Sequence, residues 1–262
     1  MSRPIRIRVA AIAGLFYSAD PDALRANVRR QLDSVEPVDI PGSRLVIAPH
    51  AGHQYSGPVA AHAYQRLVRS CRRIALLGPS HRVRFTGMAL STADYFETPL
   101  GTIPVDRAGA DKLTNTHSTL AALDEAHRLE HSLEVHLPFL QEQLGAFELL
   151  PIVVGDATPT AVAAVIESIW EDDDYAIVVS TDLSHFHEYH AAKTIDAETA
   201  RAIKRRDTNI RPDQACGCQP LNGALHFAEQ RDLSVSELAL LNSGDTAGSR
   251  ERVVGYASFA IA

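Results

Sequence analysis

Leu45-Val-Ile-Ala48 runs directly into Pro49-His50-Ala-Gly-His53, so a short apolar stretch ends in a turn that carries two histidines. The stretch has no polar residue to place against water, which predicts a strand buried on both faces of a sheet. The proline and the glycine after it favour a tight turn, where the backbone comes close to a small site. This unit, a buried strand with histidines at its end, predicts both the fold class and the place of the chemistry.

Two further segments repeat the unit. Ile74–Leu77 precedes Gly78-Pro-Ser-His81, and Tyr175–Val179 precedes Ser180-Thr-Asp-Leu-Ser-His185. In open α/β sheets the ligand crevice lies beyond the carboxyl ends of the strands. A lone histidine at a strand end is usually a hydrogen-bonded structural residue. Three such ends indicate a shared metal or catalytic centre, because neutral imidazole is the commonest metal ligand.

Helical patterns separate the apolar runs almost from end to end. Asp20-Pro-Asp22 provides an N-cap, a first-turn proline and a first-turn acid, and the stripe Leu24, Val28 and Leu32 follows. Ser56-Gly-Pro58 is expected to open a second helix. Further helices are expected at 106–116, 158–169, 190–206 and 219–231, a mostly helical run interrupted by Pro138 at 124–144, a hairpin or irregular excursion at 87–105, and strands at 149–154, 238–241 and 253–259. The alternation predicts one α/β domain over residues 1–262, with a largely parallel sheet covered by helices on both faces.

Composition excludes several classes of protein. Lys and Arg total 25 against 32 Asp and Glu, and the net charge of -7 offers no global basic surface for nucleic acid. No apolar run approaches the ~20 residues of a membrane helix, so we expect no membrane partner. Residues 5–9 alternate Ile and Val with Arg, which favours a half-buried strand over a signal peptide. With only three cysteines, we expect reduced thiols and a cytoplasmic protein.

Cys216 and Cys218 immediately precede a predicted helix. The helix dipole favours thiolate at such a position, which makes a metal ligand or reactive thiol one interpretation; the other is a small buried hydrophobic residue. Cys71 lies in the basic segment 69–73, far from the histidine turns, and is expected to be structural. The acidic run 171–174 is expected to be a solvated loop.

The segment Glu130-His-Ser-Leu-Glu-Val-His-Leu-Pro138 carries a further cluster of polar residues. On a helix His131 and Glu134 would share a face. Two interpretations stay open: a capping serine in a surface charge cluster, or residues that support the ligands of the site. Five other histidines have no partner that the sequence identifies, and they are expected to be structural: His62, His117, His127, His190 and His226.

Seven ordered motifs also match a known family: Ala13-Gly-Leu-Phe-Tyr17, Ala48-Pro-His-Ala-Gly52 with Tyr55-Ser-Gly57, Leu77-Gly-Pro-Ser-His81, Glu130 to Pro138, Ser180 to His185, Cys216-Gly217, and Gly255-Tyr-Ala257. With them the chain resembles the Memo family, the Memo-like protein B of the AmmeMemoRadiSam systems, along nearly its whole length. The resemblance implies a fold similar to the class III extradiol dioxygenases, which use non-haem Fe(II).

The same resemblance implies a set of site residues. It places the metal ligands at His50, His81 and Cys216, with Asp182 and His185 beside them as the catalytic pair. It also implies a functional link to a radical-SAM protein and an AMMECR-like protein. Two positions depart from the family pattern, because His53 stands where a tyrosine is usual, and Cys218 follows Cys216-Gly217 where relatives often carry a basic residue.

Two imidazoles and one anion leave open positions on a first-row metal, as in non-haem iron oxygenases. Fe(II) is the expected metal, although a thiolate ligand also suits Cu and Zn. The first hypothesis is therefore an iron-dependent oxidoreductase that acts with O₂ on a small polar or aromatic substrate. His185 is its candidate general acid or base, and Asp182 would fix the tautomer of His185 or contact a metal-bound water. The alternative is a metal-binding redox or scaffold protein that docks a partner peptide in a histidine-lined cleft without turnover. A third hypothesis is a metal-dependent hydrolase, but the sequence shows no dedicated pair of carboxylate ligands for it.

Overall fold

Four parallel strands form the centre of the main sheet. The computed structural model describes residues 4–36 and 42–262, and its central strands are β2 (Leu45–Ala48), β9 (Tyr175–Ser180), β3 (Arg73–Pro79) and β8 (Glu148–Val154), side by side in that order. Each pair is parallel. The histidine turns therefore leave the sheet at the same edge, as the sequence predicts.

Antiparallel strands border this parallel centre. On one side β12 (Val253–Ile261) runs antiparallel to β2, and β10 (His185–His187) and β11 (Val235–Asn242) both pair with β12. On the other side β4 (Met88–Leu90) is antiparallel to β8 and parallel to β7 (Leu120–Ala122). The α/β fold is confirmed, and the sheet is parallel at its centre and mixed at its edges.

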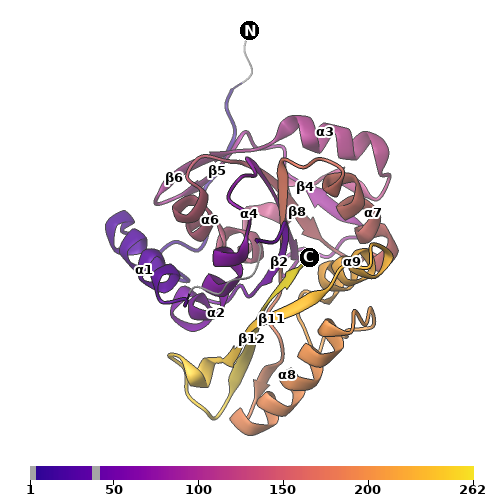
Figure 1. Cartoon of the computed structure of the whole chain (residues 1–262). Helices are drawn as coiled ribbons and strands as arrows, with labels where there is room; N and C mark the ends of the chain where they lie inside the picture. The colour runs from indigo at the N-terminus through magenta and orange to yellow at the C-terminus, as the bar shows by residue number, and fades with distance from the viewer. Residues whose placement is uncertain (1–3, 37–41) are drawn as a thin grey trace.

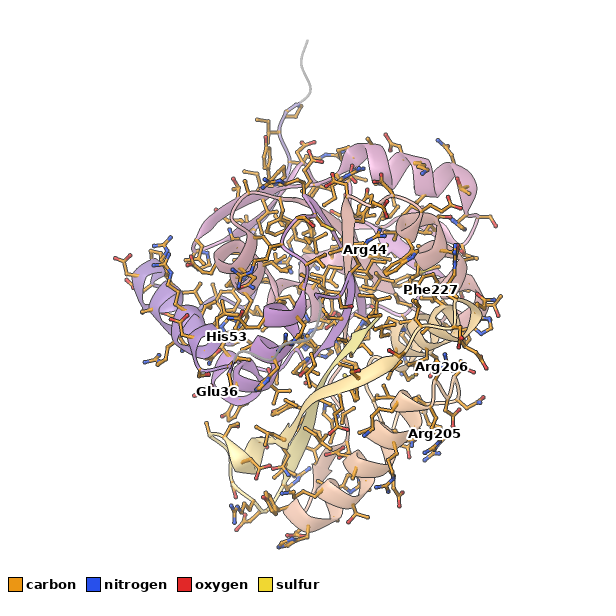
Figure 2. The ribbon with its side chains drawn as sticks, in the orientation of Figure 1. Glu36, Arg44, His53, Arg205, Arg206 and Phe227 are labelled. Atoms are coloured by element: carbon orange, nitrogen blue, oxygen red, sulfur yellow. The ribbon has the colours of Figure 1, made fainter. Side chains whose placement is uncertain are left out.

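Helices cover both faces of the sheet (Figure 1). One layer contains α1 (Pro21–Asp33), α2 (His53–Arg66) and α6 (Leu137–Leu144), and the other contains α3 (Arg107–Thr116), α7 (Pro159–Trp170) and α9 (Cys218–Gln230). The side chains of β2 alternate between the two cores: Leu45 and Ile47 join one, Val46 and Ala48 the other. Phe227 of α9 is buried in the first of these cores (Figure 2). Burial on both faces explains why this strand has no polar residue.

The remaining elements lie around these layers. Helix α8 (Tyr189–Lys204) packs against β11 and β12, and two short helices, α4 (Asp124–Arg128) and α5 (His131–Glu134), precede α6. A 3₁₀ turn covers Ser243–Asp245. The strands β5 (Tyr95–Thr98) and β6 (Gly101–Pro104) form the hairpin expected within residues 87–105. No helix in the ranges 4–36 and 42–262 has the length and apolar character needed to cross a bilayer.

In the strand near the N-terminus, the side chains that face inward and outward are exchanged relative to the prediction. Only Ile7–Arg8 forms a strand, β1, which pairs with β5. Ile7 is 47% exposed and Arg8 is 8% exposed, so the arginine rather than the isoleucine faces inward. The guanidinium of Arg8 pairs with the buried carboxylate of Glu134 and donates to the carbonyls of His127 and Glu130. A partner distant in the sequence thus overrides the local alternation.

Two local predictions need correction. Helix α2 begins at His53 rather than Ser56, because Gly52 forms its N-cap and its carbonyl accepts from the Ser56 N–H; Pro58 lies inside the helix. Residues 124–144 form three short helices, and Pro138 lies in the first turn of the last of them instead of interrupting one. The acidic loop 171–174 is solvent-exposed as predicted, and its aspartates also pair with Arg44 and Arg73.

Candidate metal centre

Three imidazoles meet beyond the carboxyl ends of the central strands. His50 follows β2, His81 follows β3, and His131 is the first residue of α5; each offers one ring nitrogen, and these nitrogens lie within 4.8 Å of one another. The ring centroids of His81 and His131 are 4.4 Å apart, and those of His50 and His81 are 5.1 Å apart. His50 is fully buried and His81 is partly exposed. The described residues thus contain a group of donors that could hold one metal ion.

Glu130 orients His81. Its carboxylate lies 2.8 Å from His81 Nδ1 and also accepts from the backbone N–H of His81 at 2.6 Å. Burial by itself would raise the pKa of Glu130, but the hydrogen bonds from His81 and Ser132 outweigh it and lower the pKa to about 2. A carboxylate only accepts, so His81 carries its proton on Nδ1 and has its free lone pair on Nε2. The surface-cluster interpretation of this segment is wrong, because Glu130 is buried and supports the site.

Glu134, the last residue of α5, serves the fold and is not one of the clustered donors. It accepts from the backbone N–H groups of Ala11 and Ile12 and from the Tyr17 hydroxyl, in addition to Arg8. These bonds hold residues 11–17 against α5. The ring of Phe16, in the same segment, lies 5.0 Å from that of His131. Glu134 therefore fixes a wall of the site without entering it.

Cys216 reaches the histidine cluster, and Cys218 does not. The sulfur of Cys216 lies 3.2 Å from His50 Nε2 and accepts from the Asp182 backbone N–H at 3.4 Å. A Cβ at Gly217 would stand 2.4 Å from the Ser180 carbonyl oxygen, so only glycine lets this loop approach β9 so closely. Cys218 starts α9 and is buried in the hydrophobic core. Burial, with the nearby Asp182 charge, raises the pKa of Cys216, so here desolvation outweighs the expected dipole effect.

Asp182 and His185 lie near His50. Asp182 accepts from the His50 backbone N–H at 2.7 Å, and burial raises its pKa to about 7 against the effect of that bond. His185 Nδ1 is 2.8 Å from the Leu183 carbonyl, so this nitrogen carries the proton and Nε2 the lone pair. The tautomer of His185 is thus fixed by this carbonyl rather than by Asp182, which corrects one of the two roles expected for Asp182. Burial lowers the pKa of His185, which keeps the ring neutral at pH 7.

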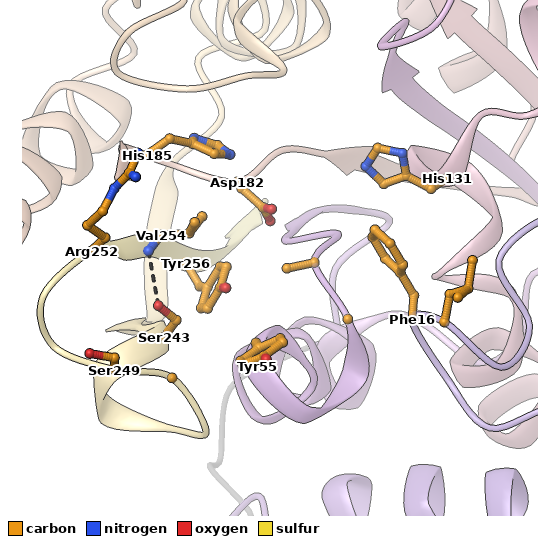
Figure 3. Close-up of a pocket in the computed structure, with 14 residues that line it drawn as sticks. Phe16, Tyr55, His131, Asp182, His185, Ser243, Ser249, Arg252, Val254 and Tyr256 are labelled. Carbon is orange, nitrogen blue, oxygen red and sulfur yellow. Dashed lines mark hydrogen bonds between the residues drawn. The ribbon is translucent and has the colours of Figure 1, made fainter. Parts of the chain in front are cut away.

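A cavity of about 490 Å³ has Asp182 and His185 in its lining. Asp182, His185 and His131 lie along one side of it, as Figure 3 shows. Aromatic side chains form much of the remaining wall, and Arg252 lies at the His185 end, opposite Phe16. The aromatic residues of the lining are Phe16, Tyr55 and Tyr256.

His131 is the site residue that sequence reasoning left without a role. Its Nδ1 is buried and makes no hydrogen bond among the described residues, although it lies 3.4 Å from Glu130 Oε1. A buried donor or acceptor of this kind needs a partner, and a metal ion bound by the cluster fits that need. The sequence offered one signal, the acidic residue Glu130 directly before His131. A helix of only four residues is too short for a periodic pattern that would show which of its faces is buried.

His53, the departure from the family's usual tyrosine, lies outside the cluster. Its ring is buried 4.8 Å from that of Phe139, and Nε2 is 2.9 Å from the Val135 carbonyl. Burial lowers its pKa to about 4. His53 therefore acts as a neutral core residue that ties α2 to the segment before α6.

Comparisons with known proteins agree with this architecture. A family model described as Memo-like protein matches residues 8–260. A MEMO1 family protein of Methanothermobacter thermautotrophicus is 36% identical over 275 residues, covering 96% of this chain and 99% of the relative. A MEMO1 family protein of Sulfolobus acidocaldarius is 32% identical over 285 residues, covering 96% and 98%. The chain therefore belongs to the Memo family.

Proposed function

We propose that the protein is a metal-dependent oxidoreductase that holds non-haem Fe(II) with His50, His81 and Cys216 and acts on a small substrate. The observation that carries the proposal is the meeting of imidazole and thiol donors beside a cavity, whose lining includes the neighbouring residues His131, Asp182 and His185. Two imidazoles and a thiolate would leave positions open for other ligands. Bound Fe(II) would supply the one-electron chemistry that reaction with O₂ requires.

Proton transfer falls to Asp182 and His185. With a pKa of about 7, Asp182 holds or releases a proton near neutrality. His185 is neutral and offers its Nε2 lone pair, so it accepts a proton from a substrate hydroxyl in the cavity. Such positioned groups typically contribute ~10²–10⁴-fold in rate.

The cavity supports a small substrate with an aromatic or polar body. Its volume lies within the usual range for small-molecule sites. The aromatic wall suits a planar ring, and the guanidinium of Arg252 at the far end suits a polar or anionic substituent. A cytoplasmic location and a functional link to radical-SAM and AMMECR-like proteins belong to the same proposal.

Elemental analysis of anaerobically purified protein tests the metal, and Fe(II)-dependent O₂ uptake with catechol and 4-hydroxybenzoate tests the reaction. We expect about one iron per chain, lost in His81→Ala and kept in His117→Ala. His117 is a suitable control because it bonds to Ser168, outside the site. Tight metal binding without O₂ uptake would favour the alternative, a metal-binding redox or scaffold protein that docks a peptide in the cleft.

A further inference from the structure

A buried row of hydrogen-bonded polar side chains contacts His50, and none of its members lines the cavity. Ser180 is the last residue of β9, and its Oγ has three neighbours: His50 Nδ1 at 2.6 Å, His136 Nε2 at 2.8 Å and the Ser132 carbonyl oxygen at 2.7 Å. Ser180, Ser132 and both imidazoles are at most 1% exposed. Since these groups are shielded from solvent, they must satisfy one another.

The hydroxyl of Ser180 has a single proton, and its position is determined by its neighbours. A carbonyl oxygen only accepts, so the 2.7 Å contact with Ser132 takes that proton. The Oγ lone pairs then face His50 and His136, and both rings have to donate. His50 therefore carries its hydrogen on Nδ1 and His136 on Nε2.

The far end of the row agrees with this assignment. With its hydrogen on Nε2, neutral His136 has a lone pair on Nδ1, and the Tyr64 hydroxyl lies within hydrogen-bonding distance of that atom. Burial raises the pKa of Tyr64, and burial with the neighbouring His53 lowers the pKa of His136 to about 3, so both stay neutral. The hydrogen bonds therefore all run one way, from Tyr64 through His136 to Ser180.

We infer that Ser180 is the positioning residue that fixes His50 in its Nδ1–H form and so directs the Nε2 lone pair toward Cys216 and the metal centre. The reverse setting, with Ser180 donating to His50, would leave the buried Ser132 carbonyl without this bond and place a hydrogen where a metal has to bind. The inference rests on the proposed function only in taking His50 as a ligand. His81 is oriented by the charged Glu130, so the two imidazoles reach the same state through different acceptors.

The tautomer is measured directly in metal-free protein. Long-range ¹H–¹⁵N correlation spectra of ¹⁵N-labelled protein separate the two forms of each neutral imidazole, and His50→Ala assigns the signal. We expect His50 in the Nδ1–H form. A dominant Nε2–H form would overturn the inference, and this reading needs neither metal nor turnover, so it is independent of the proposed function.

Removal of the hydroxyl tests the consequence. Ser180→Ala takes away the acceptor of His50, and we expect it to shift the tautomer and weaken Zn²⁺ binding about 10–100-fold in a chelator competition. Ser258→Ala is the matched control, because Ser258 is equally buried and its hydroxyl has no hydrogen-bond partner among the described residues.

A double substitution separates positioning from packing. If Ser180 acts through His50, adding Ser180→Ala to His50→Ala costs no further Zn²⁺ affinity. An equal loss in both backgrounds would mean that Ser180 only supports the fold, and the inference would be wrong. If Ser180→Ala does not fold, the His50 tautomer measured in the unaltered protein still tests the inference.

Discussion

Cys216 and Cys218 stand two positions apart in opposite environments. One sulfur touches His50 Nε2, and the other is packed in the core. We expect Cys216→Ala to lose most Fe(II) or Cu(I) binding and Cys218→Ala to keep it, measured by metal titration under anaerobic conditions. The reverse ranking would mean that the ligand has moved along the chain. A larger loss in His131→Ala than in Cys216→Ala would assign the third position to the imidazole instead.

His185 is expected to handle protons rather than hold the metal. Its Nδ1 donates to the Leu183 carbonyl, and it lies outside the group of ring nitrogens formed by His50, His81 and His131. His185→Ala should therefore retain bound iron while O₂ uptake falls ~10²-fold or more. Iron content and uptake are measured on the same sample, and a metal loss equal to that of His81→Ala would make His185 a ligand.

Helix α5 carries a residue of the site, His131, and a structural one, Glu134. Glu134→Gln leaves the guanidinium of Arg8 buried without its counter-charge, so we expect the free energy of unfolding to fall by about 3 kcal/mol. Denaturant unfolding measures it. The control is Glu125→Gln, an exposed pair with Arg128 that should change nothing measurable. Similar effects in the two variants would contradict a special role for the buried pair.

The success of prediction from sequence differs between elements for physical reasons. Strand β2 was predicted with its observed bounds because burial on both faces leaves a continuous apolar run. The N-cap at Asp20 and the stripe Leu24, Val28 and Leu32 were equally local signals, and both are confirmed. Strand β1 failed because the inward turn of Arg8 depends on Glu134, 126 positions away.

The site divides in the same way. His50 and His81 were found because strand ends at one sheet edge have to converge, and that argument needs no side-chain detail. His131, Ser180 and His136 stood in the quoted motifs, but their roles could not be assigned, because these depend on contacts between segments far apart in the sequence. Whether His50, His81 and Cys216 bind the metal stays a prediction.

Buried neutral histidines make the whole molecule sensitive to acid. Burial lowers the pKa of His127 to about 4, against the opposing effect of the Ala89 carbonyl that its ring faces. As pH falls below 6.5 the unfolded chain takes up this proton and the folded chain does not, so stability is lost between pH 6.5 and 4. The histidine accounts for about 3 kcal/mol of that loss.

Denaturant unfolding of metal-free protein between pH 7 and 4.5 measures this effect. We expect stability to fall with pH in the parent protein and more shallowly in His127→Gln, whose amide can still donate to the Ala89 carbonyl. Asp196, with a pKa raised to about 6 by burial, acts with the opposite sign and is unchanged in both proteins. Identical slopes would show that His127 is not neutral in the fold.

The contact between His50 and Cys216 joins positions 166 residues apart in the chain. During synthesis His50 and His81 leave the ribosome long before Cys216 is made. At that stage β9, the strand that ends at Ser180, has not been made either. The donors therefore come together only when most of the polypeptide has been released and the long-range strand pairing is complete. A nascent chain accordingly has no assembled centre with which to trap a metal ion, and any loading of the proposed centre would follow completion of the fold.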